Sequence, residues 1–275
     1  MSVSPSITPQ TLAVSKPKPQ VAAIIPAYNE SDRVCDVLET LCAACSVDEV
    51  ICVTDGCTDD TVAQVNNWLD SREENPRVPA RLLALSQNIG KGGAMAHGAH
   101  NTFADILLFL DADLIGLRPS QVDDMLAPML RAKDPADMTL GLFGAVRGGL
   151  LGWWLGWCHR AAPSITGQRA IRRDVFLSVP GLTRSRFGVE AAITGHVQSD
   201  PTLHVDYVYI HSVTHPIKEE KLGPLKGFRN RMRMYRDIAQ TLLAAKARRS
   251  AQEQREKMLL RREKAAAWLD KWDHK

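Results

Sequence analysis

Short apolar runs alternate with amphipathic segments along the first half of the chain. The runs cover residues 21–25, 49–54, 81–85 and 104–110. They predict strands, because a strand covered on both faces of a parallel sheet is apolar throughout. Apolar positions recur at helical spacing in the intervening segments, which predicts helices over residues 31–45, 59–69, 93–103 and 121–131. Strands that alternate with helices on short connections indicate an α/β fold, Rossmann-like, with a mostly parallel sheet and helices on both faces.

Particular residues set the expected limits of these elements. We expect Pro26 to end the first strand, since proline cannot donate to a sheet ladder. Ser31 is the expected cap of the first helix. Asp59 and Asp60 would lie in the first turn of the second helix, where negative charge suits the helix dipole.

The pattern changes after residue 131. Residues 138–143, 164–172 and 204–209 predict further strands, the last at a sheet edge, and residues 187–196 predict a helix. Residues 148–158 are rich in glycine and tryptophan and are too short to span a bilayer as a helix. A packed flap is the first interpretation of this segment, and an acceptor-side wall or shallow membrane contact is the alternative.

Composition divides the 275 residues into three parts. Residues 1–20 lack the apolar core of a secretory signal, so we expect a flexible leader and no export. Residues 21–220 form the expected catalytic domain, and residues 221–275 a basic helical extension. From Pro216 onward there are 17 Lys and Arg against 8 Asp and Glu, although the net charge of the chain is only +3. The extension is either a solvated helix or a basic amphipathic helix attracted to an anionic membrane surface, and nucleic acid is not an expected partner.

The six cysteines show no disulfide framework, which favours a reducing compartment. We therefore expect a cytoplasmic protein, with peripheral attachment to the inner face of the membrane as the alternative. Cys42 and Cys45 form a single C-x-x-C, which we interpret as core packing because no second pair completes a zinc site.

Polar motifs follow four successive predicted strands. They are Pro26-Ala27-Tyr28-Asn29-Glu30, Asp55-Gly56-Cys57-Thr58-Asp59-Asp60, Asn88-Ile89-Gly90-Lys91-Gly92-Gly93 and Asp111-Ala112-Asp113. Each alone is typical of a turn, a helix entry or a cap. Together they would meet at the carboxyl edge of the sheet, where open α/β sheets bind ligands. Asp111 and Asp113 would repel each other there unless a hard cation such as Mg²⁺ or Mn²⁺ neutralised them, and Lys91 suits the phosphates of a nucleotide.

This order of motifs resembles the nucleotide-binding half of family 2 glycosyltransferases with the GT-A fold, over about the first 120 residues. The resemblance implies that Asp111 and Asp113 bind a divalent metal, which would act as a Lewis acid on the leaving nucleotide diphosphate. It also implies a set of residues that contact the donor. These are Pro26, Ala27, Tyr28, Glu30, Asp55, Gly90, Lys91, Asp111, Ala112 and Gly167.

Residues of the second half are similar to those of glucosyl-3-phosphoglycerate synthases and related retaining enzymes. The similar residues are Ile165–Arg173, Gly188-Val189-Glu190 and His215. The resemblance implies that Glu190 holds sugar hydroxyls and that His215 is the third metal ligand, with His211 as its rival. Asp113, Glu190 and Arg169 are the residues predicted to take part in catalysis. The structural alternatives are that Glu190 only complements a helix dipole, and that Gln168 and Arg169 lie on the surface of an edge strand.

The predicted activity is transfer of a sugar from a nucleotide-diphosphate sugar, UDP-linked by expectation, to a small phosphorylated or lipid-linked acceptor. The resemblance favours retention of the anomeric configuration. The alternative is an inverting family 2 transferase acting on a polyprenyl phosphate or another lipid, with Glu190 as its base. A nucleotidyltransferase would carry its glycine-rich signature after the first strand, where this chain has Pro-Ala-Tyr-Asn-Glu. A non-catalytic membrane-surface binding protein is the last alternative, and a homodimer is a further partner hypothesis.

Overall fold

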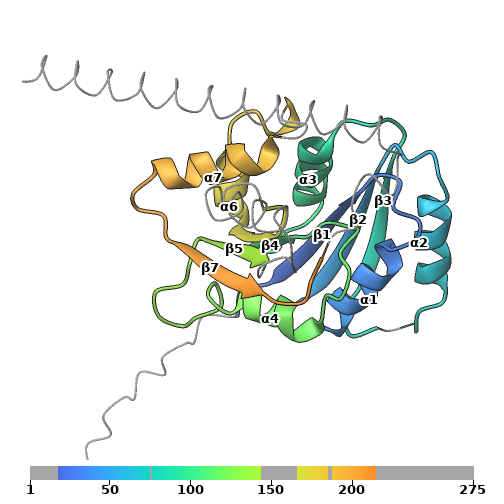
Figure 1. Cartoon of the computed structure of the whole chain (residues 1–275), viewed down its shortest axis with the longest axis horizontal. Helices are drawn as coiled ribbons and strands as arrows, with labels where there is room; N and C mark the ends of the chain where they lie inside the picture. The colour runs from blue at the N-terminus through green and yellow to red at the C-terminus, as the bar shows by residue number, and fades with distance from the viewer. Residues whose placement is uncertain (1–17, 75, 144–165, 185–187, 215–275) are drawn as a thin grey trace, which may run out of the picture.

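A seven-stranded sheet forms the centre of the molecule (Figure 1). The structure, a computed structural model, describes residues 18–74, 76–143, 166–184 and 188–214. The strand order is β3-β2-β1-β4-β6-β5-β7. The strands are β1 (Val21–Ala27), β2 (Glu49–Asp55), β3 (Ala80–Leu85), β4 (Ile106–Phe109), β5 (Met138–Phe143), β6 (Arg169–Arg172) and β7 (Val205–Ile210). The predicted α/β fold with a mostly parallel sheet is confirmed.

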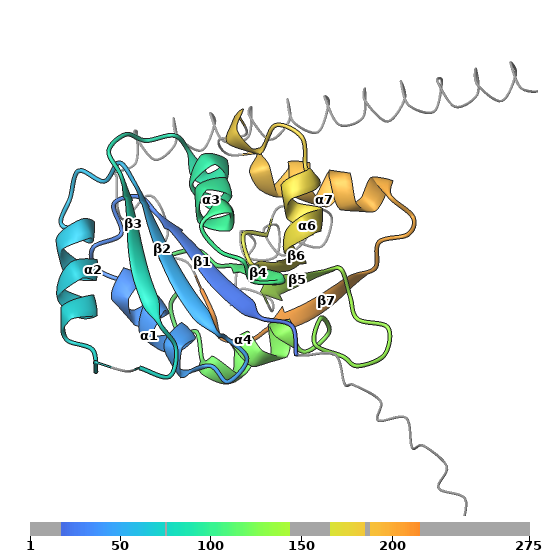
Figure 2. The ribbon, with the colours of Figure 1, turned by 180° about the vertical axis from the view of Figure 1, so that it is seen from behind.

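Helices cover both faces of this sheet, as predicted (Figure 2). One face carries α1 (Val34–Ala43), α2 (Thr61–Asp70) and α4 (Pro119–Leu126). The other carries α3 (Lys91–His100), α6 (Arg173–Ser178) and α7 (Val189–Ser199), with a short 3-10 helix at Leu182–Arg184.

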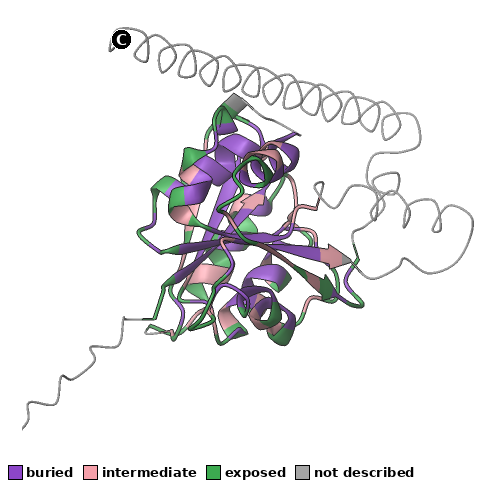
Figure 3. Cartoon of the chain, turned by 90° about the vertical axis from the view of Figure 1, so that its left-hand side faces the viewer, coloured by how far each residue is buried: buried purple, intermediate pink, exposed green. Residues whose placement is uncertain are grey.

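Alternation along β1 shows how one strand serves two cores. Val21, Ala23 and Ile25 pack with α1 and α4, whereas Ala22 and Ile24 pack with α3 on the opposite side. All five residues have no exposed surface. Buried residues accordingly fill the sheet and the inner sides of the helices, and exposed residues lie on the periphery (Figure 3).

β6 is the strand that departs from the parallel arrangement. It is antiparallel to both of its neighbours, β4 and β5, and its register pairs Arg169 with Phe109 at the end of β4. The alternative that Gln168 and Arg169 lie on an edge strand is therefore wrong, because β6 is inside the sheet and neither residue has any exposed surface. The edge position predicted for residues 204–209 is confirmed, since β7 is the last strand of the sheet.

Three expectations about element limits are corrected. Pro26 does not end β1: it pairs with β2, and the pairing with β4 has already stopped at Ile24, so no partner on that side needs its missing N–H. Ser31 does not cap α1, which begins at Val34 after a turn that Glu30 closes with its carbonyl oxygen. Asp59 and Asp60 precede α2 instead of lying in its first turn.

Several predictions fall outside the described residues. They are the leader, the tryptophan-rich segment 148–158, His215 and the basic extension, so the three-part division of the chain stays a prediction. Within the described ranges, no helix is both long and apolar enough to cross a membrane.

Candidate functional site

The loops that follow β1 and β2 are bonded to each other at the carboxyl edge of the sheet. The amide N–H of Asn29 donates to Sγ of Cys57 at 3.4 Å, and its side-chain oxygen accepts from the N–H of Thr58 at 2.8 Å. The N–H of Glu30 donates to Oγ1 of Thr61 at 2.9 Å. Two of the predicted motifs are thus brought together as expected.

Asp55 connects the end of β2 to the glycine turn before α3. Its two carboxylate oxygens accept the main-chain N–H groups of Ile89 at 2.7 Å and Gly90 at 2.9 Å, and the residue is only 4% exposed. Gly90 has φ 87°, a left-handed conformation that favours glycine. Asp55 therefore fixes the turn that delivers Lys91, and its predicted contact with the nucleoside stays a prediction.

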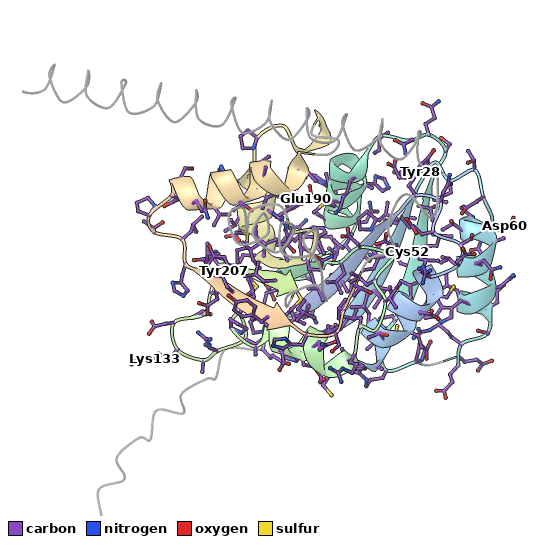
Figure 4. The ribbon with its side chains drawn as sticks, in the orientation of Figure 1. Tyr28, Cys52, Asp60, Lys133, Glu190 and Tyr207 are labelled. Atoms are coloured by element: carbon purple, nitrogen blue, oxygen red, sulfur yellow. The ribbon has the colours of Figure 1, made fainter. Side chains whose placement is uncertain are left out.

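The remaining residues after β1 differ in what they present. Tyr28 is 47% exposed at this edge (Figure 4), and Pro26 and Glu30 are partly exposed. Ala27 and Ala112, by contrast, are buried in the core beneath α1 and α4. The predicted donor contacts of these two alanines stay predictions.

Lys91 joins the predicted metal site to the predicted sugar-binding residue. Its Nζ lies 2.6 Å from Oδ1 of Asp111 and 2.6 Å from Oε1 of Glu190, which comes from the first turn of α7. Partial burial lowers the pKa of Lys91, but the two carboxylates outweigh burial and raise it above its ordinary value. The ammonium group is therefore charged at neutral pH and neutralises part of a close carboxylate pair.

The segment before β6 holds the other side of Asp111. Nε2 of Gln168 donates to Oδ2 of Asp111 at 2.9 Å, and Oε1 of Gln168 accepts from the hydroxyl of Thr166 at 2.9 Å. A Cβ on Gly167 would lie 2.5 Å from Oδ2 of Asp111, so a side chain there would displace the carboxylate. Gly167 is thus beside the predicted metal ligand, and its predicted contact with the donor stays a prediction.

Arg169 bonds to two segments beside the predicted site. Its guanidinium is fully buried and donates to the main-chain oxygens of Thr166 and Glu190, the latter at 3.0 Å, and to Oγ1 of Thr194 at 3.4 Å. Burial lowers the pKa of Arg169 to about 10, although Glu190 and Asp111 favour the charged form. Arg169 thus ties the start of α7 to the segment before β6, and its predicted part in catalysis stays a prediction.

Asp111 and Asp113 are the two carboxylates predicted to hold a divalent ion at this edge. Asp111 and Asp113 are partly exposed and separated by one residue, and Gly167 packs closely against the carboxylate of Asp111. Among the described residues, no three His, Cys, Asp or Glu side chains are grouped to hold a metal. A pair of carboxylates fits Mg²⁺ or Mn²⁺, because such ions are commonly held by one or two carboxylates together with substrate phosphates.

The two histidines considered as ligands are not equivalent in the structure. His211 is exposed after β7, and its carbonyl oxygen accepts from Nε2 of Gln121 at 2.6 Å. His215 lies beyond the described residues, so its predicted ligand role stays a prediction. Gln168 and Thr166 are the site residues that sequence reasoning did not assign; the motif Thr-Gly-Gln just before Arg169 was the available signal.

Comparisons with known proteins point to one family. The model of the family described as "Glycosyl transferase family 2" matches residues 22–194. Glucosyl-3-phosphoglycerate synthase of Mycolicibacterium smegmatis is 33% identical over 132 residues, 46% of this chain and 41% of that protein. Undecaprenyl-phosphate 4-deoxy-4-formamido-L-arabinose transferase of Klebsiella pneumoniae is 31% identical over 135 residues, 48% of this chain and 38% of that protein. The chain thus spans about two fifths of the length of these relatives.

A solved structure shares the fold. Glucosyl-3-phosphoglycerate synthase of Mycobacterium tuberculosis, in complex with Mn²⁺, UDP-glucose and phosphoglyceric acid, superposes with a TM-score of 0.61 at 22% identity over 82% of this chain and 79% of that chain. The same enzyme with Mg²⁺ and UDP also gives a TM-score of 0.61. This likeness confirms the predicted GT-A fold.

Proposed function

The chain belongs to glycosyl transferase family 2, and from this premise we propose that it transfers a sugar from a UDP-linked donor to a phosphorylated acceptor, with Mg²⁺ or Mn²⁺ bound. The observation that carries the proposal is the meeting of Asp111, Lys91 and Glu190 at the carboxyl edge of the sheet. These residues come from the end of β4, α3 and α7, and a structural role alone does not require two carboxylates around one partly exposed lysine.

Asp111 and Asp113, with His215, are the proposed metal ligands. The bound metal would supply Lewis-acid stabilisation of the charge that develops on the leaving diphosphate. The solved structures of glucosyl-3-phosphoglycerate synthase with Mn²⁺ or Mg²⁺ and UDP support this assignment. Lys91 would add a second positive charge beside the same phosphates, and it is already charged.

Glu190 is proposed to hold hydroxyl groups of the donor sugar. Its carboxylate is anchored on one side by Lys91, and its main-chain oxygen accepts from Arg169, so its position is fixed before the donor binds. An inverting transferase needs a carboxylate that takes a proton from the acceptor. In this structure the Glu190 carboxylate contacts Lys91 at 2.6 Å, which supports a role in holding the donor, and hence retention, over a role as that base.

A donor screen tests the proposal. Release of UDP from a panel of UDP-sugars is measured with Mn²⁺ and a phosphorylated three-carbon acid as acceptor, comparing the wild type with Asp113→Ala. We expect metal-dependent release that falls at least about 100-fold in the variant, a loss typical of removing one preorganised electrostatic group. The anomer of the product, read by NMR, decides between retention and inversion. Calorimetry that detects no binding of UDP with Mn²⁺ would overturn the proposal and favour a non-catalytic surface protein.

A lipid-linked acceptor is the second candidate. The similarity to an undecaprenyl-phosphate transferase supports it, since that relative aligns over 48% of this chain. A parallel reaction with polyprenyl phosphate in detergent separates the two acceptors. Turnover with the lipid phosphate alone would favour this second candidate, and turnover with the three-carbon acid alone would exclude it.

A further inference from the structure

The ammonium group of Lys91 contacts Asp111, the carboxylate that is proposed to bind the metal. This ammonium group contacts one oxygen of Asp111 and one of Glu190 at 2.6 Å each, while Gln168 contacts the second oxygen of Asp111. The side chain is only one quarter exposed, as is that of Asp111. In a partly buried site of this kind, two cations near the same carboxylate repel each other more strongly than they would in water.

Hydrogen bonds fix the main chain at both Lys91 and Glu190. Lys91 is the first residue of α3, just after the turn that Asp55 fixes, and Glu190 lies in a helix whose start is tied to Arg169. Glu190 can therefore not move far to make room for a second cation. The ammonium group is the part that can move, because it ends a flexible four-carbon stem.

We propose that Lys91 is an internal counter-ion that suppresses binding of the divalent metal alone and makes metal binding depend on the nucleotide diphosphate. When a diphosphate arrives with the metal, its negative charges offer Lys91 a new partner, so the ammonium group leaves Asp111 to the metal. Without the diphosphate, the metal must bind Asp111 beside a lysine whose charge only Glu190 still balances. Metal and nucleotide then bind with positive coupling, and the coupling is reciprocal.

This inference rests on the proposed function, and a titration of the metal keeps the two apart. Binding of Mn²⁺ to the full chain is followed by the loss of the free-ion EPR signal, with and without UDP. Lys91→Met removes the charge and keeps much of the side-chain volume, whereas Lys91→Arg retains the charge. Lys91→Gln, which can still donate to Asp111, replaces the methionine variant should that variant not fold.

Lys133→Met is the matched control. Lys133 is an exposed lysine in the loop before β5 and lies far from Glu190 in Figure 4, so its removal changes the net charge equally without touching the site. Any general effect of lost charge on Mn²⁺ binding appears in this variant as well.

We expect Lys91→Met to bind Mn²⁺ alone about tenfold more tightly than the wild type, within the range of ordinary site-to-site coupling. UDP should tighten Mn²⁺ binding less in this variant than in the wild type, while the Lys91→Arg and Lys133→Met proteins behave like the wild type. Unchanged or weaker binding of Mn²⁺ alone by Lys91→Met would overturn the inference. Should UDP have no effect on Mn²⁺ binding to the wild type, the proposed function fails, and the titrations without UDP still decide the role of Lys91.

Discussion

Gly167→Ala should impair the site while leaving the fold intact. The added Cβ would lie 2.5 Å from Oδ2 of Asp111 and 2.9 Å from its Cγ and Oδ1. Gly167 does not have a left-handed backbone conformation, so its main chain can accept alanine, and the three atoms nearest to the added Cβ all belong to Asp111.

The size of the effect follows from this distance. Non-bonded carbon and oxygen atoms do not approach within about 3 Å, so the carboxylate must move by roughly 0.5–1 Å. A misplacement of about 1 Å in a catalytic arrangement costs up to about 100-fold in rate. We expect kcat/KM to fall by about 10- to 100-fold, or about 1.4–2.7 kcal/mol in transition-state stabilisation. Because Asp111 is partly exposed and can swing outward, the free energy of unfolding should change by less than about 1 kcal/mol.

The assay combines UDP release, calorimetric binding of UDP with Mn²⁺, and chemical denaturation. Gly181→Ala is the control, because we expect it to lower stability without changing activity. Gly181 has φ 75°, and a Cβ added there would meet no atom within 4 Å, so alanine should cost about 1 kcal/mol of stability through backbone strain and leave kcat/KM unchanged. A Gly167→Ala protein with wild-type kcat/KM and UDP affinity would refute the reasoning, since the position of the Asp111 carboxylate would then not matter.

Three further predictions concern groups around the site and in the core. Asp55→Asn places an amide N–H against the main-chain N–H groups of the glycine turn, so the free energy of unfolding in urea should fall by about 1–3 kcal/mol. Slight burial raises the pKa of Asp59, but hydrogen bonds from Thr61 outweigh burial and lower it. The ionised carboxylate therefore stabilises the fold at pH values above its unfolded pKa of about 3.9, and this stabilisation is lost as the pH falls through the lower folded pKa. The difference in Tm between the wild type and Asp59→Asn that is measured at pH 7 should accordingly disappear below about pH 4. Burial raises the pKa of the Cys52 thiol, so peptide mapping after iodoacetamide treatment at neutral pH should find the exposed Cys45 modified and Cys52 unmodified, and equal labelling would contradict the structure.

Much of the fold could be predicted because its strands are buried on both faces. The runs at residues 21–25 and 49–54 are apolar throughout, and the structure places them next to each other at the centre of the sheet. Element limits were less accurate because they depend on local hydrogen bonds. The carbonyl oxygen of Glu30, for example, accepts from both Arg33 and Val34, and this turn delays the start of α1 beyond Ser31.

The candidate site was predictable where a general rule gathers the residues. The motifs after β1, β2, β3 and β4 meet because parallel strands end at one edge. The ion pair of Lys91 with Glu190 joins residues 99 positions apart, and no local pattern indicates it. The burial of Arg169 was missed for a similar reason, since an arginine in a four-residue strand gives no sign of whether its strand is central or at an edge.

The reversed direction of β6 explains why the second half of the chain reaches the site at all. Because β6 is antiparallel to β4, its first residue, Arg169, pairs with the last residue of β4, and residues 166–168 emerge beside Asp111. In a parallel strand of the same four residues, that segment would leave the sheet at the opposite edge, about 13 Å away at 3.3 Å per residue. The nucleotide-binding half carries all four polar motifs. Without the segment before β6, however, Asp111 would lack its partner Gln168, and without α7, Lys91 would lack its partner Glu190. The site is therefore a product of the sheet as a whole, and one inverted strand is the feature that assembles it.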